Sequence, residues 1–322
     1  MTSRASPARY LVSCAFGVAA AAGLAAAVQP ETRPPLVNRV MQLTRESPWT
    51  LVASVPLTFT AHHPQGLVKI GDTFFLSSVE VKVPARRLAV PTGGLDRDPG
   101  EGVGHLFTFD GAGKLLADLR LGEGTVYHPG GLDYDGRHLW VPVAEYRPNS
   151  RSIIYRVDPG DLQATEILRF ADHIGALVHN TDGRTLHGVS WGSRRFYRWT
   201  LGANGAVTNL GVPPEQLRTL NTSHYVDYQD CKYAGAHRML CTGVTELRPT
   251  REAPPFRLGG VDLIDLRDGR PAHQVPVPLW TPAGLDMTHN PVWLEPTATG
   301  LRGYFMPEDG RATLYIYDVA FN

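Results

Sequence analysis

The stretch HPQGLVKIGDTFFLSSVE, residues 63–80, begins with a histidine, runs through an apolar segment to Gly71, and continues through a second apolar segment to Glu80. Residues 128–145, HPGGLDYDGRHLWVPVAE, repeat these features in the same order and at the same spacing, with Gly136 before Glu145. Two apolar runs around a glycine turn predict a pair of antiparallel strands. The sequence therefore predicts a unit of histidine, strand, turn, strand and acid.

This unit recurs along the chain. The five motifs that open it are HPQGL from His63, HPGGL from His128, HIGAL from His173, HYVDY from His224 and HNPVW from His289. A self-similar unit of about 45–65 residues has the size of a four-stranded propeller blade. The first strands of the five units are expected at residues 66–70, 131–134, 175–179, 224–228 and 291–296.

The ends of the chain complement each other in this scheme. The fifth unit has sequence for three strands only, whereas residues 49–59 (WTLVASVPLTF) predict a strand that precedes the first unit. An N-terminal strand that completes the last blade closes a propeller ring and covers its open edge. The fold class expected is therefore all-β, a five-bladed β-propeller over residues 48–322, with a six-bladed ring as the alternative.

Composition agrees with this fold and excludes one class of partner. The chain carries 33 glycines and 26 prolines, which suits a β fold with many turns. Its 31 basic residues balance 31 acidic ones, so no basic field is available to attract nucleic acid.

The N-terminus is expected to direct export. Residues 1–28 combine Arg4 and Arg9 with an alanine-rich apolar run, as in a cleaved signal peptide, with a retained membrane anchor as the alternative. Residues 29–47 are proline-rich and charged, which indicates a linker. In a secreted or periplasmic protein, Cys231 and Cys241 on neighbouring strands are expected to form a disulfide.

After these features a resemblance can be stated. The HHPQGL opening followed by GDTFFLSSVE resembles an uncharacterised family of bacterial secreted proteins, a domain of unknown function, over most of the chain beyond residue 28. The resemblance implies a propeller, and it implies no activity.

Circular repetition predicts the site. The first strands of a propeller line its axis, so the five histidines should meet at one mouth of the channel, with the acids outside them. We expect four of them to bind a divalent transition metal such as Fe, Zn, Cu or Mn, because imidazoles suit such ions. Carboxylates commonly orient ligating imidazoles. The expected ligands are His63, His128, His224 and His289, and the expected orienting acids are Glu80, Glu145, Glu246 and Glu308.

The third unit has Trp191 where its acid would stand, so His173 is expected to act in catalysis, together with Glu80 and Glu145. The function expected is a monomeric secreted enzyme that acts on a small molecule through the metal, by hydrolase, lactonase, lyase or oxygenase chemistry. The alternative is a non-catalytic binding propeller whose histidine ring is structural.

Overall fold

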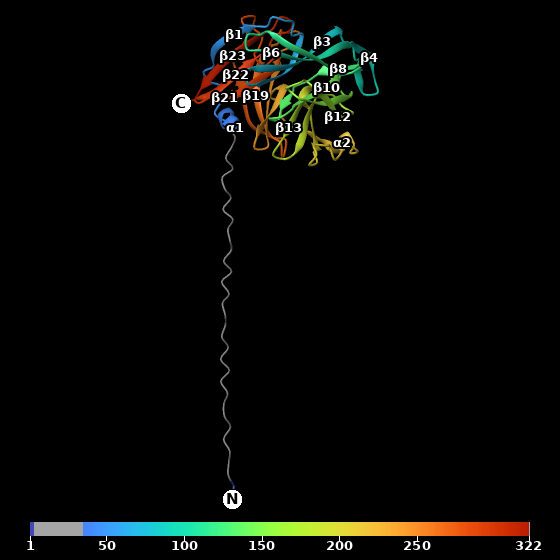
Figure 1. The fold of residues 1–322 in the computed structure, drawn as a ribbon, viewed down its shortest axis with the longest axis vertical. Helices are drawn as coiled ribbons and strands as arrows, with labels where there is room; N and C mark the ends of the chain where they lie inside the picture. Colours follow the sequence, from blue (N-terminus) through green and yellow to red (C-terminus); the bar gives the residue numbers. More distant parts are fainter. Residues whose placement is uncertain (3–34, 322) are drawn as a thin grey trace. The chain divides into compact units, whose positions relative to one another are not determined.

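The computed structural model describes residues 1–2 and 35–321. Within this part of the chain, antiparallel sheets form the five blades of a β-propeller ring (Figure 1), which confirms the fold class and the number of blades expected from the repeats. No helix in the described ranges is long and apolar enough to cross a membrane. The segment expected to be a signal peptide lies mainly outside the described residues.

Each blade takes its strands in chain order from the axis outward. Blade 1 consists of β2 (His63–Ile70), β3 (Thr73–Val83), β6 (Glu101–Asp110) and β7 (Leu115–Leu121). Blade 2 consists of β8 (Val126–Pro129), β9 (Asp133–Tyr134), β10 (Leu139–Glu145), β11 (Ser152–Val157) and β12 (Ala164–Phe170). Blade 3 consists of β13 (Ile174–Asn180), β14 (Thr185–Ser190), β15 (Arg195–Thr200) and β16 (Arg218–Leu220). Blade 4 consists of β17 (Asp227–Gly235), β18 (Arg238–Leu247), β19 (Phe256–Asp265) and β20 (Pro271–Val277).

Blade 5 contains the ring closure. It consists of β21 (Val292–Pro296), β22 (Gly300–Phe305), β23 (Thr313–Ala320) and, on its outer edge, β1 (Thr50–Pro56). Strand β1 runs antiparallel to β23, with Thr50 opposite Asp318 and Pro56 opposite Thr313, so blue and red strands lie side by side in Figure 1. The expected closing strand is confirmed, and it protects an edge that β23 would otherwise expose.

Hydrophobic packing follows the seams between blades. Each of the five buried clusters joins two neighbouring blades; the blade 5–blade 1 cluster, for example, brings Leu67 and Phe74 against Tyr304 and Leu314. A sheet with two apolar faces can bury both faces only if it lies between two other sheets. A ring of blades provides this arrangement.

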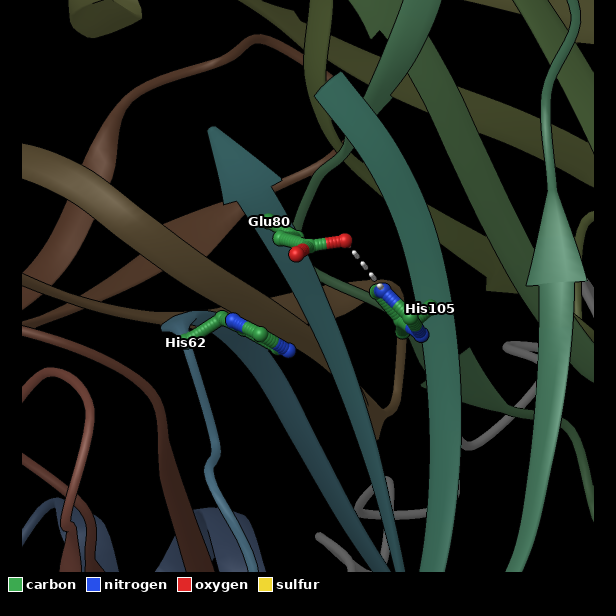
Figure 2. Close-up of side chains that lie close together, drawn as sticks. All are labelled: His62, Glu80 and His105. Atoms are coloured by element: carbon green, nitrogen blue, oxygen red, sulfur yellow. Dashed lines mark ion pairs between the residues drawn. The ribbon is translucent and has the colours of Figure 1, made fainter. Parts of the chain in front are cut away.

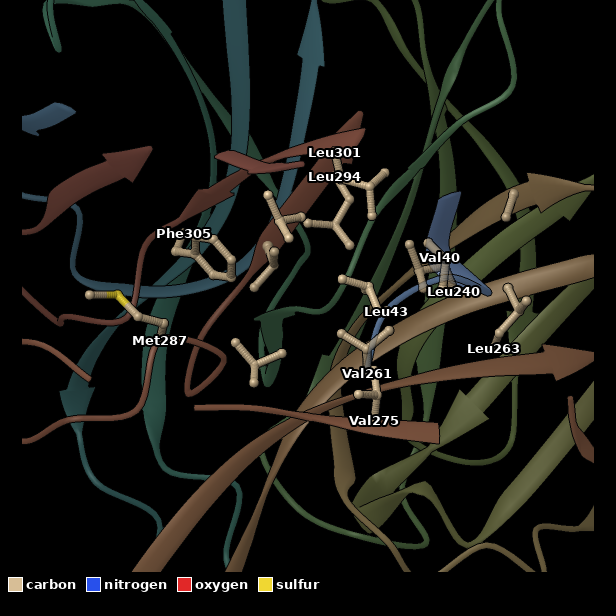
Figure 3. Packing of buried hydrophobic residues seen from close by; sticks show 14 of the residues in the cluster. Val40, Leu43, Leu240, Val261, Leu263, Val275, Met287, Leu294, Leu301 and Phe305 are labelled. Carbon is tan, nitrogen blue, oxygen red and sulfur yellow. The ribbon is translucent and has the colours of Figure 1, made fainter. Parts of the chain in front are cut away.

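Part of the expected linker belongs to this core. Helix α1 (Pro35–Val40) and the following turn bury Val37, Val40 and Leu43 against blades 4 and 5 (Figure 3). The apolar residues of this short segment recur at helical spacing, which a proline-rich and charged composition concealed.

Strand boundaries differ from the expected ones in ways that matter for the site. Strand β17 begins at Asp227 and not at His224, and the first strand of blade 2 is interrupted between β8 and β9. The long loop after β3 contains a hairpin of β4 (Arg87–Thr92) and β5 (Leu95–Arg97). In blade 3, the helix α2 (Pro214–Leu217) directly precedes the outer strand β16.

The expected disulfide is present. Cys231 in β17 lies directly opposite Cys241 in β18, and the two sulfur atoms are bonded. The bond joins the innermost two strands of blade 4 and fixes their pairing.

The axis of the ring is filled by polar groups from blade 4. The buried Asp230 carboxylate accepts a hydrogen bond from the Leu67 backbone N–H of blade 1 at 3.0 Å. It also forms an ion pair with the Lys232 ammonium. The Lys232 ammonium also donates to the Leu132 carbonyl oxygen of blade 2 at 2.5 Å. These bonds tie blades 1, 2 and 4 together across the axis.

Candidate functional site

A pocket of about 290 Å³ is lined by residues of the first strands of blades 1 to 4 and of the segments next to them. Three of the five predicted axial histidines line it, one each from blades 1, 2 and 3. Its lining residues are His63, Gln65, His128, Tyr146, His173, Gly175, Ser190, Trp191, Gly192, Asp227, Tyr228 and Gln229. The repeat therefore brings His63, His128 and His173 to one mouth of the propeller.

His63 is oriented by a carboxylate from the neighbouring blade. Its Nδ1 lies 2.8 Å from Oδ1 of Asp309, which also accepts a hydrogen bond from the Asn290 side chain at 3.0 Å. Burial raises the pKa of Asp309, but the hydrogen bond and charge of His63 outweigh burial and leave that pKa below its usual value. An ionised Asp309 accepts a hydrogen bond from the Nδ1–H group of His63, which orients the ring and leaves Nε2 for another partner.

His128 is buried and has no hydrogen-bond partner for either ring nitrogen among the described residues. Its ring stacks on Tyr146, with centroids 4.4 Å apart and planes inclined by 15°. Burial, with the nearby charges of His173 and His63, holds the pKa of His128 well below its ordinary value. This imidazole is therefore neutral at pH 7 and has a lone pair free for a ligand.

His173 is oriented by the backbone. Its Nδ1 lies 2.8 Å from the carbonyl oxygen of Glu145. A carbonyl oxygen only accepts, so Nδ1 carries the proton and Nε2 is the unprotonated nitrogen. Burial lowers the pKa of His173 to about 4, which keeps this ring neutral as well.

The three rings lie close together without sharing one point. The ring centroids of His63 and His128 are 6.4 Å apart, and those of His128 and His173 are 5.8 Å apart. Metal–nitrogen bonds of about 2 Å would place two imidazole centroids on one ion roughly 5 Å apart. The rings would have to move toward one another by about 1 Å to hold an ion together.

The other two predicted ligands lie elsewhere. The Nδ1 of His224 is 2.6 Å from the Arg194 guanidinium, a donor that uses this nitrogen as its acceptor. His289 faces the buried Asp286, with 3.7 Å between Nδ1 and the carboxylate. Both histidines stand three residues before their strands, β17 and β21, whereas His63 is the first residue of β2. This shift in register explains why a four-histidine ring does not form.

The predicted orienting acids do not reach the axial imidazoles through their side chains. Glu145 accepts hydrogen bonds from Thr125, Arg147 and Arg151 at 2.6, 2.7 and 2.9 Å. Burial raises its pKa, and the hydrogen bonds from Arg147 and Thr125 lower it further than burial raises it. Only its backbone carbonyl serves His173.

Two of the other acids are also engaged away from the pocket. Glu246 pairs with Arg248 and Arg257, and Glu308 accepts from the Thr313 N–H and the Tyr315 hydroxyl. The carboxylate that does orient an axial histidine is Asp309, the residue after Glu308. The fourth acid, Glu80, lies 3.9 Å from Nε2 of His105 and takes part in a different group.

Aromatic residues form one wall of the pocket. Tyr146 and Trp191 lie with ring centroids 5.6 Å apart, and the Arg97 guanidinium from the β4–β5 hairpin covers Trp191 at 5.0 Å. Trp191 belongs to the short 3-10 helix η1 (Trp191–Ser193), where the third unit lacks its acid. Tyr146 directly follows Glu145, so strand alternation could have identified it once Glu145 was assigned to the other face.

A second group of potential metal ligands lies outside the residues that line the pocket. Among the described residues, His62, Glu80 and His105 are the set of three His, Cys, Asp or Glu side chains whose ligand atoms all lie within 4.8 Å of one another (Figure 2). The axial histidines do not meet this criterion as placed. The sequence repeat did not indicate this group, because its members occupy three different positions of a single unit.

Comparisons with known proteins give the family and little else. No curated protein matches the chain. Among solved structures, a luciferin-regenerating enzyme is similar over 84% of this chain and 95% of its own, at 10% identity and a TM-score of 0.44. A calcium-binding regucalcin from Agrobacterium tumefaciens covers 84% and 96%, at 16% identity and a TM-score of 0.41.

A tail fibre of Staphylococcus aureus phage P68 is similar over 88% of this chain and 55% of its own, at 8% identity and a TM-score of 0.45. At these values none of the three structures bears on the activity. Residues 24–322 match the model of a family described as being of unknown function, and the chain accordingly belongs to that family, DUF6454.

Proposed function

We propose that this protein is an enzyme that binds one divalent transition metal with His63, His128 and His173 and acts on a small molecule in the adjoining pocket. One observation carries the proposal: three imidazoles from three blades line one pocket, and in two of them, His63 and His173, Nδ1 is hydrogen-bonded to an oxygen atom outside the pocket lining, which leaves Nε2 for a ligand. Orientation of this kind, by a carboxylate or a backbone carbonyl on the other ring nitrogen, is usual for histidines that bind metals.

The donor set favours a transition metal. Imidazole nitrogen suits Zn, Cu, Fe and Ni, whereas calcium prefers oxygen ligands. Because neither nitrogen of His128 is hydrogen-bonded to a described residue, its ring can turn toward an ion without breaking a hydrogen bond. Three protein ligands would leave further positions on the ion open to the pocket, as in catalytic zinc sites.

The chemistry proposed follows from an open metal position. A bound ion polarises a carbonyl oxygen or lowers the pKa of a bound water to near 7. Tyr146 and Trp191, whose rings are inclined by 47°, offer aromatic contacts to the substrate, and Gln65 and Gln229 offer hydrogen bonds at other points of the lining. This arrangement supports hydrolase, lactonase or lyase chemistry, and with iron or copper it supports oxygenase chemistry, on a substrate that fits about 290 Å³.

A second candidate function is a propeller that binds a small ligand without catalysis. The observation that favours it is the spacing of the rings, 5.8 and 6.4 Å between centroids, which is wider than a shared ion requires. In this case the same pocket would bind a polar ligand through the imidazole nitrogens.

Export is part of the proposal. The Cys231–Cys241 disulfide supports a protein that works in an oxidising compartment, as the expected signal peptide would require. A monomer is proposed because the closing strand completes the ring within one chain.

Metal analysis of the purified chain separates the two candidate functions. We expect the His63→Ala/His128→Ala variant to lose about one equivalent of transition metal relative to the wild type, and His224→Ala to retain it. Replacing Asp309 by Asn should weaken metal binding about 10- to 100-fold, since it frees the His63 tautomer. Glu308→Gln, the adjacent carboxylate, is the matched control and should leave affinity unchanged. Equal metal content in the double variant and the wild type would favour the binding propeller.

A further inference from the structure

The group formed by His62, Glu80 and His105 packs beside the blade 5–blade 1 core cluster, and none of its members lines the axial pocket; Figure 2 shows the three side chains. His105 is in β6, Glu80 is in β3, and His62 ends the segment that carries the chain from the closing strand β1 into blade 1. The rings of His62 and His105 stack on each other, with centroids 5.2 Å apart. Phe107, part of the blade 5–blade 1 core cluster, stacks on both rings.

His105 has the features of a histidine prepared for a ligand. Its Nδ1 lies 2.8 Å from Oδ1 of Asp118 on the neighbouring strand β7. The Nε2 atom is buried, has no hydrogen-bond partner among the described residues, and faces Glu80 across 3.9 Å. A buried imidazole nitrogen without a partner is costly unless something binds it. The carboxylate on the opposite nitrogen matches the arrangement around metal-bound histidines.

His62 is held in this group by an unusual backbone conformation. Its φ of 57° lies in the left-handed region, which non-glycine residues seldom adopt. Blade 5 holds the segment from the other side, because the Gly310 N–H donates to the His62 carbonyl at 2.6 Å and the Ala61 N–H donates to the Gly310 carbonyl at 2.8 Å. Burial, followed by the charge of His105, lowers the pKa of His62 from its ordinary value.

We propose that His62, His105 and Glu80 bind a divalent cation of the zinc type and that Asp118 is its positioning residue. Two histidines and a glutamate are an established ligand set for zinc, and water would complete a tetrahedral site. The exposed Lys82 ammonium lies 3.7 Å from the Glu80 carboxylate. On metal binding, this ammonium would turn into the solvent and leave the carboxylate to the ion. The ion would fasten the segment from the closing strand onto blade 1, and would therefore stabilise the closed ring.

This site is independent of the proposed axial metal. His62 and His63 are adjacent, but the left-handed backbone of His62 separates their rings, which have different partners. His63 lines the pocket and contacts Asp309, whereas His62 stacks on His105. A chain with both sites filled would bind two equivalents of metal.

The test titrates the stripped full chain with Zn²⁺ and with Co²⁺, whose absorption spectrum reports tetrahedral nitrogen and oxygen ligands. The background variant His128→Ala/His173→Ala, which lacks two axial ligands, should still bind one equivalent. Adding His105→Ala should weaken this binding by more than about 100-fold, and adding Asp118→Asn by about 10- to 100-fold. His138→Ala, which replaces a histidine outside both groups, should change nothing.

A second variant separates metal binding from packing. His62→Gly removes a ligand while placing glycine at a φ that glycine prefers. Its metal-free thermal midpoint should equal or exceed that of the wild type, and the rise in midpoint that Zn²⁺ gives the wild type should disappear. The proposal is overturned if the background variant binds no Zn²⁺, or if His62→Gly and His105→Ala leave the zinc response unchanged. If only the axial variants lose one equivalent of bound metal, the proposed function holds and the His62–Glu80–His105 group binds no metal.

Discussion

Individual buried histidines give this protein a defined response to acid. His187 in β14 is buried, and its Nε2 lies 2.9 Å from the Thr185 hydroxyl. Burial, followed by the charges of Arg198 and His237, lowers the pKa of His187 to about 3. In the unfolded chain the same ring titrates at about 6.5. The unfolded state therefore binds more protons than the folded state below pH 6.5, and stability falls as the pH is lowered.

We expect the free energy of unfolding of the wild type to fall by roughly 3 kcal/mol between pH 6.5 and pH 4 through His187 alone. The His187→Gln variant keeps a polar partner for Thr185. Over the same pH interval, its free energy of unfolding should fall by roughly 3 kcal/mol less than that of the wild type. Urea unfolding of metal-free protein at several pH values measures the difference. Parallel pH profiles for the two proteins would contradict the prediction.

At the scale of the element, glycines near the axis allow the first strands of the blades to approach one another. A side chain at Gly66 in β2 would place its Cβ 2.5 Å from the Leu132 Cδ2 atom and 2.6 Å from the Leu132 backbone nitrogen. Gly131 and Ala176, from blades 2 and 3, form a direct parallel bridge. The small residue of the repeated motif is therefore a packing requirement of a narrow ring.

Replacing Gly66 by Ala should destabilise the fold by about 1–3 kcal/mol, because backbone and core atoms of blade 2 would have to move. The matched control is Gly111→Ala, on a turn where no atom lies within 4 Å of the added Cβ. That change should be neutral or stabilise by up to about 1 kcal/mol. Chemical denaturation of both variants gives the comparison, and equal midpoints would show that the blades can separate without cost.

For the molecule as a whole, the core extends beyond the five sheets. Helix α1 and the turn after it cover the seam between blades 4 and 5, where Leu43 is buried beside Leu294 and Phe305 (Figure 3). The segment that leads into the closing strand β1 is thus part of the folded core. It packs on the blade 4 side of blade 5, whereas blade 1 packs on the other side of blade 5.

Leu43→Ala should therefore cost about 2–5 kcal/mol, as expected for a buried leucine. Leu220→Ala, at a position that is 67% exposed, should stay within about 0.5 kcal/mol of the wild type. Thermal or urea unfolding of the two variants measures the contrast. A neutral Leu43→Ala would return residues 35–43 to the role of a linker.

The sequence by itself determined the number of blades, the closing strand and the disulfide. These depend on alternating apolar runs and on pairing between strands that are neighbours in the chain, as for Cys231 and Cys241. It also identified His63, His128 and His173 as residues of one mouth of the ring. Each of them stands at the beginning of its blade: His63 begins β2, His128 lies in the short strand β8, and His173 directly precedes β13.

Only the tertiary structure decided which carboxylates serve these histidines. Asp309 contacts His63 and Tyr146 lines the pocket, whereas their chain neighbours Glu308 and Glu145, which were expected there, bond to other groups. The contacts that matter also cross between blades, as Asp309 to His63 and Gly310 to His62 do. Pairing between residues so distant in the chain depends on how the ring closes, and no local pattern in the sequence encodes it.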